Sequence, residues 1–390
     1  MKIFAEDINI IRKEIELIKD SLIKTSPRQL TDNIEVLEAF YQIMYELSGE
    51  EDEETIDILL KNKKLRELKA DERQRLHKKN IKNFIQNKEM HKMVSGRILD
   101  LYDKDFKYFI PKRLYLREEQ MAEIICDFFD AEFNQADKFI EFSKKGNIFR
   151  SGISDDEGST METAGYTMYD YINKNSIVVV TNDPIVWDVN MMRVIVHEFG
   201  HVVDNFDRDN ASRKDNSRYF WLSSYAEVYS MLYEKLFFDY LIKNNIFREN
   251  ASTGLKKFYM EIYDSFNSVE YLSSLSDVLL TNERYKNENN LVDQIQVDEN
   301  GSPYIASAVF DNFNETKLYS YGGIFATYFA DLKHNDPDLF NKRFIDFKNR
   351  RFGLFDFKIF EDIGTNIDEI INIYDKNLDE MTNTKKLIFK

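Results

Sequence analysis

The segment from His197 to His201, His-Glu-Phe-Gly-His, constrains the fold and the chemistry of this chain more than any other feature. Residues four positions apart lie on one face of an α-helix, so both imidazoles can point at the same ion. This is the H-E-x-x-H pattern, in which two histidines bind zinc and the glutamate, here Glu198, takes a proton from water. Apolar neighbours predict burial of this helix: Met192, Ile195, Val196, Phe199, Val202 and Val203. The charged Glu198 would then be buried as well, which requires a reason.

Composition limits the class of protein. The chain has 390 residues, a hydrophobic content of 43 %, 13 Gly and 5 Pro, which favours long helices in one large domain or two moderate ones. The single cysteine, Cys126, excludes an internal disulfide framework and a cysteine-based zinc site. A net charge of −16 disfavours general nucleic-acid binding. No apolar run approaches the roughly 18 residues of a membrane span. The charged N-terminus lacks a signal-peptide core, so we expect a cytoplasmic protein, with export without a cleaved signal left open.

Hydrophobic spacing predicts a mainly helical chain. We expect a helical N-terminal region over 1–112 and a catalytic region over 113–390. Within the first, the highly charged stretch Lys61 to Lys92 predicts an exposed helical hairpin, which is either a solvated surface or an arm that binds a protein partner. In the second, the apolar pattern predicts one long helix over Glu118 to Phe142.

The segments around the H-E-x-x-H motif are of three kinds. Lys144 to Tyr171 is polar and contains four glycines, which predicts loops that line a cleft. Ser176 to Asn182 is β-branched and predicts a strand. Asp188 is placed to cap the motif helix, and another helix, buried on nearly all sides, is predicted from about Ser224 to Lys243.

The third zinc ligand is less evident than the two histidines. Glu227 lies 26 residues after His201 (227 − 201) and is the favoured candidate. Asp207, six residues after His201, is an alternative (207 − 201). A capping box formed by Ser224 and Glu227 would give that glutamate a purely structural role. Glu234 shares a helical face with Glu227, so it could either hydrogen-bond a ligating imidazole or make a structural polar contact.

A later segment, Lys317 to Tyr328, contains two adjacent glycines within an aromatic stretch. The glycines suggest a hinge or a close approach of two backbones. Tyr321 and Tyr328 are seven residues apart and therefore on one helical face. A phenol on such a face can donate a hydrogen bond to the oxyanion that forms when water attacks a peptide carbonyl.

These residues together resemble the thimet oligopeptidase and oligoendopeptidase F family of zinc metallopeptidases, and are closer to the second branch. The resemblance rests on five segments in a shared order: Lys145 to Gly152, Ser176 to Asn182, His197 to His201, Ala226 to Leu241 and Tyr319 to Tyr328. It covers roughly residues 115 to 375.

The resemblance implies a mainly α fold, a helical zinc-metallopeptidase fold with a central cleft and a small β-sheet element before the H-E-x-x-H helix. It implies one Zn²⁺ held by His197, His201 and Glu227, with Glu234 supporting a ligand and with Tyr321 and Tyr328 contacting the substrate carbonyl. Two features depart from the family. No histidine lies in Asp311 to Ser320, just before these tyrosines, and the N-terminal region is shorter.

The expected function is therefore a zinc-dependent endopeptidase that hydrolyses short or flexible peptides, with Glu198 as the base. The alternative is a catalytically weak zinc protein that binds a peptide or a protein partner in its cleft.

Overall fold

The computed structural model describes residues 1–5, 7–22, 27–61, 63–102, 114–151, 164–170, 174–181, 188–209, 225–281, 296–297, 303–304, 313–350 and 356–383. Helices dominate these residues, and a three-stranded sheet directly precedes the helix that carries the H-E-x-x-H motif. The prediction of a mainly α chain with a small sheet before that helix is confirmed. None of the helices in the described ranges is both long and apolar enough to cross a membrane.

The chain divides into two compact units, each built from several segments. The first combines Met1–Lys63, Ile110–Ser212 and Leu236–Gly254, and the second combines Lys64–Phe109, Arg213–Lys235 and Leu255–Lys390. The domain boundary expected after residue 112 stays a prediction.

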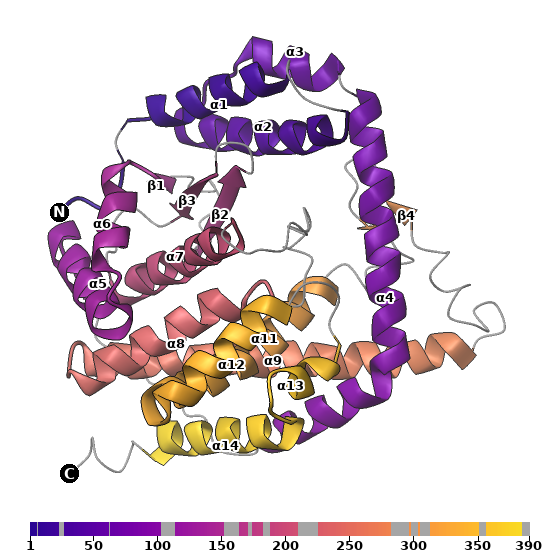
Figure 1. Ribbon diagram of the computed structural model, residues 1–390, viewed down its shortest axis with the longest axis vertical. Coiled ribbons are helices and arrows are strands. Elements are labelled where there is room, and N and C mark those ends of the chain that lie inside the picture. Colours follow the sequence, from indigo (N-terminus) through magenta and orange to yellow (C-terminus); the bar gives the residue numbers. More distant parts are fainter. Residues whose placement is uncertain are drawn as a thin grey trace. The chain divides into compact units, whose positions relative to one another are not determined.

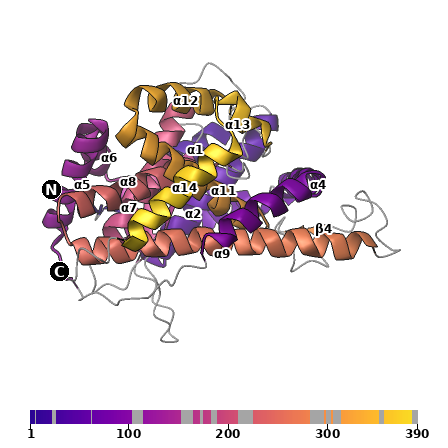
Figure 2. The ribbon, with the colours of Figure 1, turned by 90° about the horizontal axis from the view of Figure 1, so that it is seen from below.

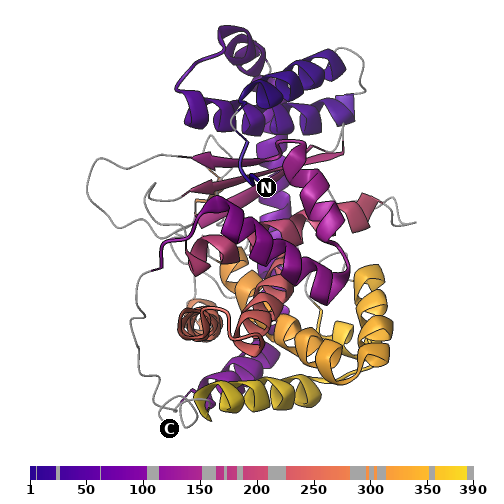
Figure 3. The same cartoon turned by 90° about the vertical axis from the view of Figure 1, so that its left-hand side faces the viewer.

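The first unit is layered around its sheet. Helices α1 (Asn9–Leu22) and α2 (Pro27–Ser48) pack against each other on one face of the sheet, and α7 (Val189–Asp209) packs on the other (Figures 1 and 3). Helices α3 (Glu53–Lys61), α5 (Glu118–Phe133) and α6 (Ala136–Lys144) complete this unit. The motif helix is therefore held against the sheet, which fixes the segment that carries the candidate ligands.

The sheet has the order β1-β3-β2, with β1 (Ile148–Ser151) parallel and β2 (Ala164–Asp170) antiparallel to the central strand β3 (Asn175–Thr181). The central strand confirms the strand predicted from its β-branched residues, and Ile177 to Val180 are almost fully buried. The prediction of loops over Lys144 to Tyr171 was wrong, because both outer strands of the sheet lie in this segment. Glycines suggested turns, whereas in β2 Gly165 allows α7 to approach closely.

The second unit contains α4 (Lys63–Asp100), β4 (Gln296–Val297), β5 (Pro303–Tyr304), α11 (Phe313–Asn335), α12 (Pro337–Arg350), α13 (Lys358–Asp362) and α14 (Ile367–Asn383). Helix α11 packs against α12 and α14, and the α11–α14 pair lies near the centre of Figure 2. Both α8 (Val228–Lys243) and α9 (Arg248–Thr281) contribute residues to each unit.

Two helix predictions were wrong in detail. The expected hairpin is one continuous helix, α4, since its sequence contains no proline and only one glycine, Gly96, near its end. Near that end Lys88 and Lys92 both donate to Asp277, so part of its charge is used within the unit. The helix predicted over 118–142 is split into α5 and α6 at Asn134, whose φ of 52° is left-handed. Asparagine tolerates this conformation and ends helices.

Candidate metal centre

Helix α7 presents the two histidines of the motif. It begins at an N-cap, because Oδ1 of Asp188 accepts hydrogen bonds from the backbone N–H groups of Asn190 and Met191 at 2.9 and 3.0 Å. This confirms the predicted cap. The rings of His197 and His201 lie 5.2 Å apart between centroids and are nearly perpendicular, at 77°. One turn of helix therefore brings both imidazoles to one face, as the spacing requires.

Aromatic packing anchors this turn of the helix. Phe199, inside the motif, has its ring centroid 4.9 Å from that of Phe129, 5.2 Å from that of Phe139 and 5.6 Å from that of Phe142. All three contacts are edge-to-face, an arrangement that stabilises aromatic pairs beyond the area that they bury. Since Phe199 points into this cluster, the histidines two positions to either side point away from it.

His197, His201 and Glu227 form a group that could hold a metal ion. Each offers one ligand atom, and these atoms all lie within 4.8 Å of one another. The group includes Glu227 and does not include Asp207, the alternative third ligand. Two imidazoles and one carboxylate are a donor set of catalytic zinc sites, in which a fourth position is kept for water or substrate.

The side chain of Glu227 is held from its own helix. The residue lies in the turn just before α8, and its Oε2 accepts a 2.9 Å hydrogen bond from the hydroxyl of Ser230. The capping box that the sequence offered as an alternative involves Ser224, which lies outside the described residues. Glu234 lies on α8 and is only 2 % exposed. Its role beside a ligating imidazole stays a prediction.

Glu198 is the candidate base, and it is 4 % exposed. Its Oε2 accepts a 2.8 Å hydrogen bond from the hydroxyl of Thr167 on β2. A buried carboxylate requires such partners, because its desolvation is otherwise costly. No sequence pattern indicated Thr167, because the contact depends on how β2 packs against α7.

The two late tyrosines lie on α11 and are both fully buried. The hydroxyl of Tyr321 lies 2.7 Å from Nδ1 of His91, a residue of α4. Burial raises the pKa of this phenol well above its usual value. A neutral phenol can donate or accept a hydrogen bond, and the direction of this one depends on the tautomer of the imidazole.

Tyr328 belongs to a polar network with Arg343 and Glu369. Arg343 donates to the hydroxyl of Tyr328, which lies 3.4 Å from Oε1 of Glu369, and Thr365 donates to Oε2 of Glu369 at 2.8 Å. Burial is the main cause that raises the pKa of Tyr328. The role of either tyrosine toward a substrate carbonyl stays a prediction.

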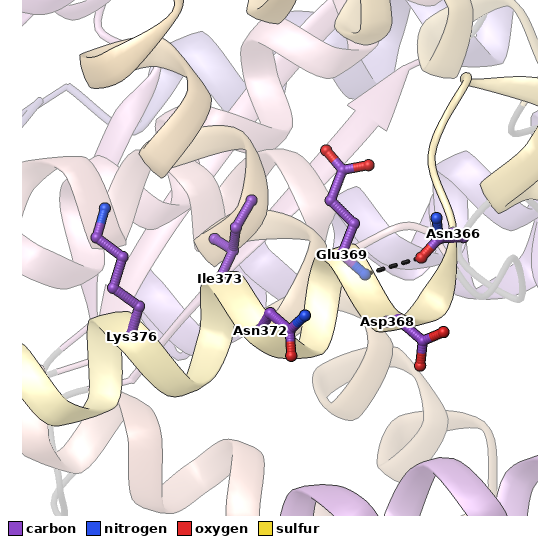
Figure 4. Close-up of a pocket in the computed structure, with 6 residues that line it drawn as sticks. All are labelled: Asn366, Asp368, Glu369, Asn372, Ile373 and Lys376. Atoms are coloured by element: carbon purple, nitrogen blue, oxygen red, sulfur yellow. Dashed lines mark hydrogen bonds between the residues drawn. The ribbon is translucent and has the colours of Figure 1, made fainter.

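A pocket over α14 lies beside this network. Figure 4 shows Glu369 and Asp368 pointing to different sides of the helix, and shows the 2.8 Å bond from the backbone N–H of Glu369 to Oδ1 of Asn366. The pocket contains none of the predicted site residues. It is lined by Asn366, Asp368, Glu369, Asn372, Ile373 and Lys376.

The glycine pair of α11 makes the close approach that the sequence suggested. A Cβ atom at Gly322 would lie 3.1 Å from Cβ of Glu227 and 3.1 Å from Sδ of Met231. A Cβ atom at Gly323 would lie 2.3 Å from Cγ1 of Ile262. Gly322 therefore lets α11 lie close to the turn that carries Glu227, and Gly323 lets it lie close to Ile262 on α9.

No protein-family model and no curated protein matches this chain. Among solved structures, the chain is similar to a protein from Chlamydophila abortus provisionally described as a peptidase, with 18 % identity, a TM-score of 0.42, and coverage of 79 % of this chain and 55 % of that one. It is similar to a protein from Bacillus anthracis str. Ames provisionally described as oligoendopeptidase F, with 13 % identity, a TM-score of 0.42, and coverage of 92 % and 64 %. It is also similar to PZ peptidase A, solved with an inhibitor, at 12 % identity, a TM-score of 0.39, and coverage of 98 % and 72 %. The chain thus spans 55 % and 64 % of the length of the first two proteins.

Proposed function

We propose that this chain is a zinc-dependent endopeptidase that hydrolyses peptide bonds in short or flexible peptides. The observation that carries the proposal is the group of His197, His201 and Glu227, with the carboxylate of Glu198 next to the first histidine on α7. Two imidazoles, one carboxylate ligand and a separate carboxylate base form the set of groups that metal-assisted peptide hydrolysis requires.

The residues of the chain fit one zinc ion. His197, His201 and Glu227 would hold it, and Glu234 would support a ligating imidazole. When bound, zinc lowers the pKa of a water molecule toward neutrality and polarises the carbonyl group of the substrate.

The remaining chemistry belongs to side chains. Glu198 would accept the proton of the attacking water and return it to the leaving amine, which is general acid–base catalysis by one carboxylate. Tyr321 or Tyr328 would donate to the oxyanion. The hydroxyl of Tyr321 would then exchange His91 for the carbonyl oxygen, and that of Tyr328 would exchange Glu369 for it. Such exchange requires that the partners of these hydroxyls move during binding.

The test combines metal content with peptide cleavage. The purified chain is analysed for bound zinc by mass spectrometry, and is incubated with a mixed peptide library and with folded proteins, with and without a chelator. We expect one zinc ion per chain, cleavage of peptides in preference to folded proteins, and loss of cleavage with the chelator.

A substitution separates the proposed activity from a contaminating peptidase. Glu198→Gln should retain zinc and reduce cleavage by about 10²- to 10⁴-fold, the usual contribution of a general base. Glu123→Gln, which changes an exposed glutamate of α5, is the matched control. A chain that binds zinc but cleaves no peptide would favour the alternative, a peptide- or partner-binding zinc protein. A chain that binds no zinc would overturn both.

A further inference from the structure

The strand β2 touches the candidate base at two positions of one face. Gly165 and Thr167 are two residues apart, so they face the same side of the strand. The hydroxyl of Thr167 donates to Oε2 of Glu198 at 2.8 Å and also lies 3.1 Å from the backbone oxygen of the same residue. A Cβ atom at Gly165 would lie 2.9 Å from Cγ and 3.0 Å from Oε1 of Glu198. The side chain of Glu198 therefore lies directly over β2.

These contacts distinguish the two oxygens of the carboxylate. Oε2 accepts the threonine hydroxyl, whereas Oε1 faces the space that Gly165 leaves by having no side chain. A Cβ atom at Gly165 would also lie 2.6 Å from Cγ1 of Val194, so any larger residue would push on α7 as well. The two positions thus hold the carboxylate from the side of the strand, with Oε2 on the hydroxyl of Thr167 and Oε1 close to Gly165.

The strand is a rigid support for this contact. Seven residues of β2 pair with β3 in antiparallel register, with Gly165 opposite Val180 and Thr167 opposite Val178. Threonine is β-branched, and its side-chain torsion is more restricted than that of serine. A hydroxyl on a paired strand can therefore orient a carboxylate on the neighbouring helix with little freedom.

We propose that Thr167 is a positioning residue for the base: its hydroxyl holds Oε2 of Glu198 and so fixes the orientation in which the carboxylate accepts the proton of water. This inference rests on the proposed function. The competing explanation is that the hydroxyl only satisfies the backbone oxygen of Glu198, in which case the carboxylate would not depend on it.

Two substitutions at the same position separate these explanations by kinetics. Thr167→Val keeps the shape and the β-branch but removes the donor, and should lower kcat by about 10- to 100-fold with KM and zinc content unchanged. Thr167→Ser keeps the donor and should restore most of kcat. The control is Thr253→Val on α9, where the hydroxyl donates to a backbone oxygen, that of Glu249. Equal kcat values for the Val variant and the parent would overturn the inference.

A second measurement requires neither zinc nor activity. Thermal unfolding of the metal-free chain is compared for the parent, Thr167→Val, Glu198→Ala and the double variant. If the hydroxyl bonds the carboxylate, Thr167→Val should lower Tm more in the parent than in the Glu198→Ala background. An equal shift in both backgrounds would overturn the proposed contact. An inactive parent would overturn the proposed function alone, because this cycle would still report on the bond.

Discussion

Nδ1 of His91 lies 2.7 Å from the hydroxyl oxygen of Tyr321, although the two residues are 230 positions apart in the sequence. Both side chains are fully buried, and the His91 ring stacks on Phe84 with centroids 4.5 Å apart. In the sequence, no histidine lies just before the tyrosines of α11. The structure brings one to Tyr321 from α4, a segment whose charge had suggested an exposed arm.

We expect this pair to contribute to stability. Tyr321→Phe removes one partner of a buried hydrogen bond with little change in packing, and should lower the free energy of unfolding by about 1–3 kcal/mol. Urea unfolding measures the change. Tyr271→Phe is the control, because the Tyr271 side chain is 63 % exposed and its hydroxyl can bond water. Equal effects at the two positions would mean that the contact with His91 stabilises nothing.

We expect Ser230 to support the metal affinity of the site. Its hydroxyl donates to Oε2 of Glu227 at 2.9 Å, and groups that orient a metal ligand typically contribute 10- to 100-fold to affinity. Ser230→Ala should therefore weaken zinc binding by about 10-fold or more, as measured by competition with a chelating dye. Ser273→Ala is a matched control, since this equally buried hydroxyl donates to a backbone oxygen, that of Val269. Unchanged affinity in Ser230→Ala would remove the serine from the site.

We expect the stability of the chain to fall at alkaline pH. Burial raises the pKa of Tyr102, Tyr321 and Tyr374 well above its usual value, and the hydroxyls of Tyr102 and Tyr374 bond each other. A phenol with a raised folded pKa contributes stability that is complete below the unfolded value, near 10, and is lost as the pH rises beyond it.

Urea unfolding at several pH values from about 8 to 11 tests this expectation. The free energy of unfolding should be flat with respect to these groups below about pH 10 and should then decrease. Tyr374→Phe should make the decrease less steep, whereas Tyr271→Phe should leave the slope unchanged. A flat curve through the alkaline range would show that these phenols ionise as easily in the folded chain as in the unfolded one.

Local patterns in the sequence were sufficient for the elements that carry the candidate ligands. The spacing of His197 and His201 places both on one face of α7, and Asp188 caps the start of that helix. The β-branched run from Ser176 predicts the central strand. Each of these patterns involves residues that are close together in the sequence. The relation of Ser230 to Glu227 is equally local, at three positions, and could have been inferred from helical spacing.

Contacts between distant segments were not predictable in the same way. Thr167 bonds Glu198 from a strand 31 positions earlier, and glycines near that strand suggested loops. His91 reaches Tyr321 across 230 positions. In both cases the residue type alone is uninformative, because the role of a threonine or a histidine depends on which side chain the tertiary fold places next to it. Asn134 splits the helix predicted over 118–142 because its backbone is left-handed. The spacing of apolar residues contains no information about this conformation.

The last expectation concerns Gly322 and tests whether the close approach of α11 to Glu227 matters for the site. Alanine normally stabilises a helix relative to glycine by about 0.5–1 kcal/mol. At Gly322 the added Cβ atom would lie 3.1 Å from Cβ of Glu227 and 3.1 Å from Sδ of Met231, so both would have to shift by a few tenths of an ångström. Gly322→Ala should therefore gain little or no stability and should weaken zinc binding through displacement of Glu227.

Gly96→Ala provides the comparison, because a Cβ atom there meets nothing within 4 Å on α4. This control should gain about 0.5–1 kcal/mol in unfolding experiments and leave zinc affinity unchanged. If Gly322→Ala matched it in both stability and affinity, α11 would adjust without moving the glutamate. The glycine would then serve packing alone, and the position of Glu227 would have to be fixed by the turn before α8 and by Ser230.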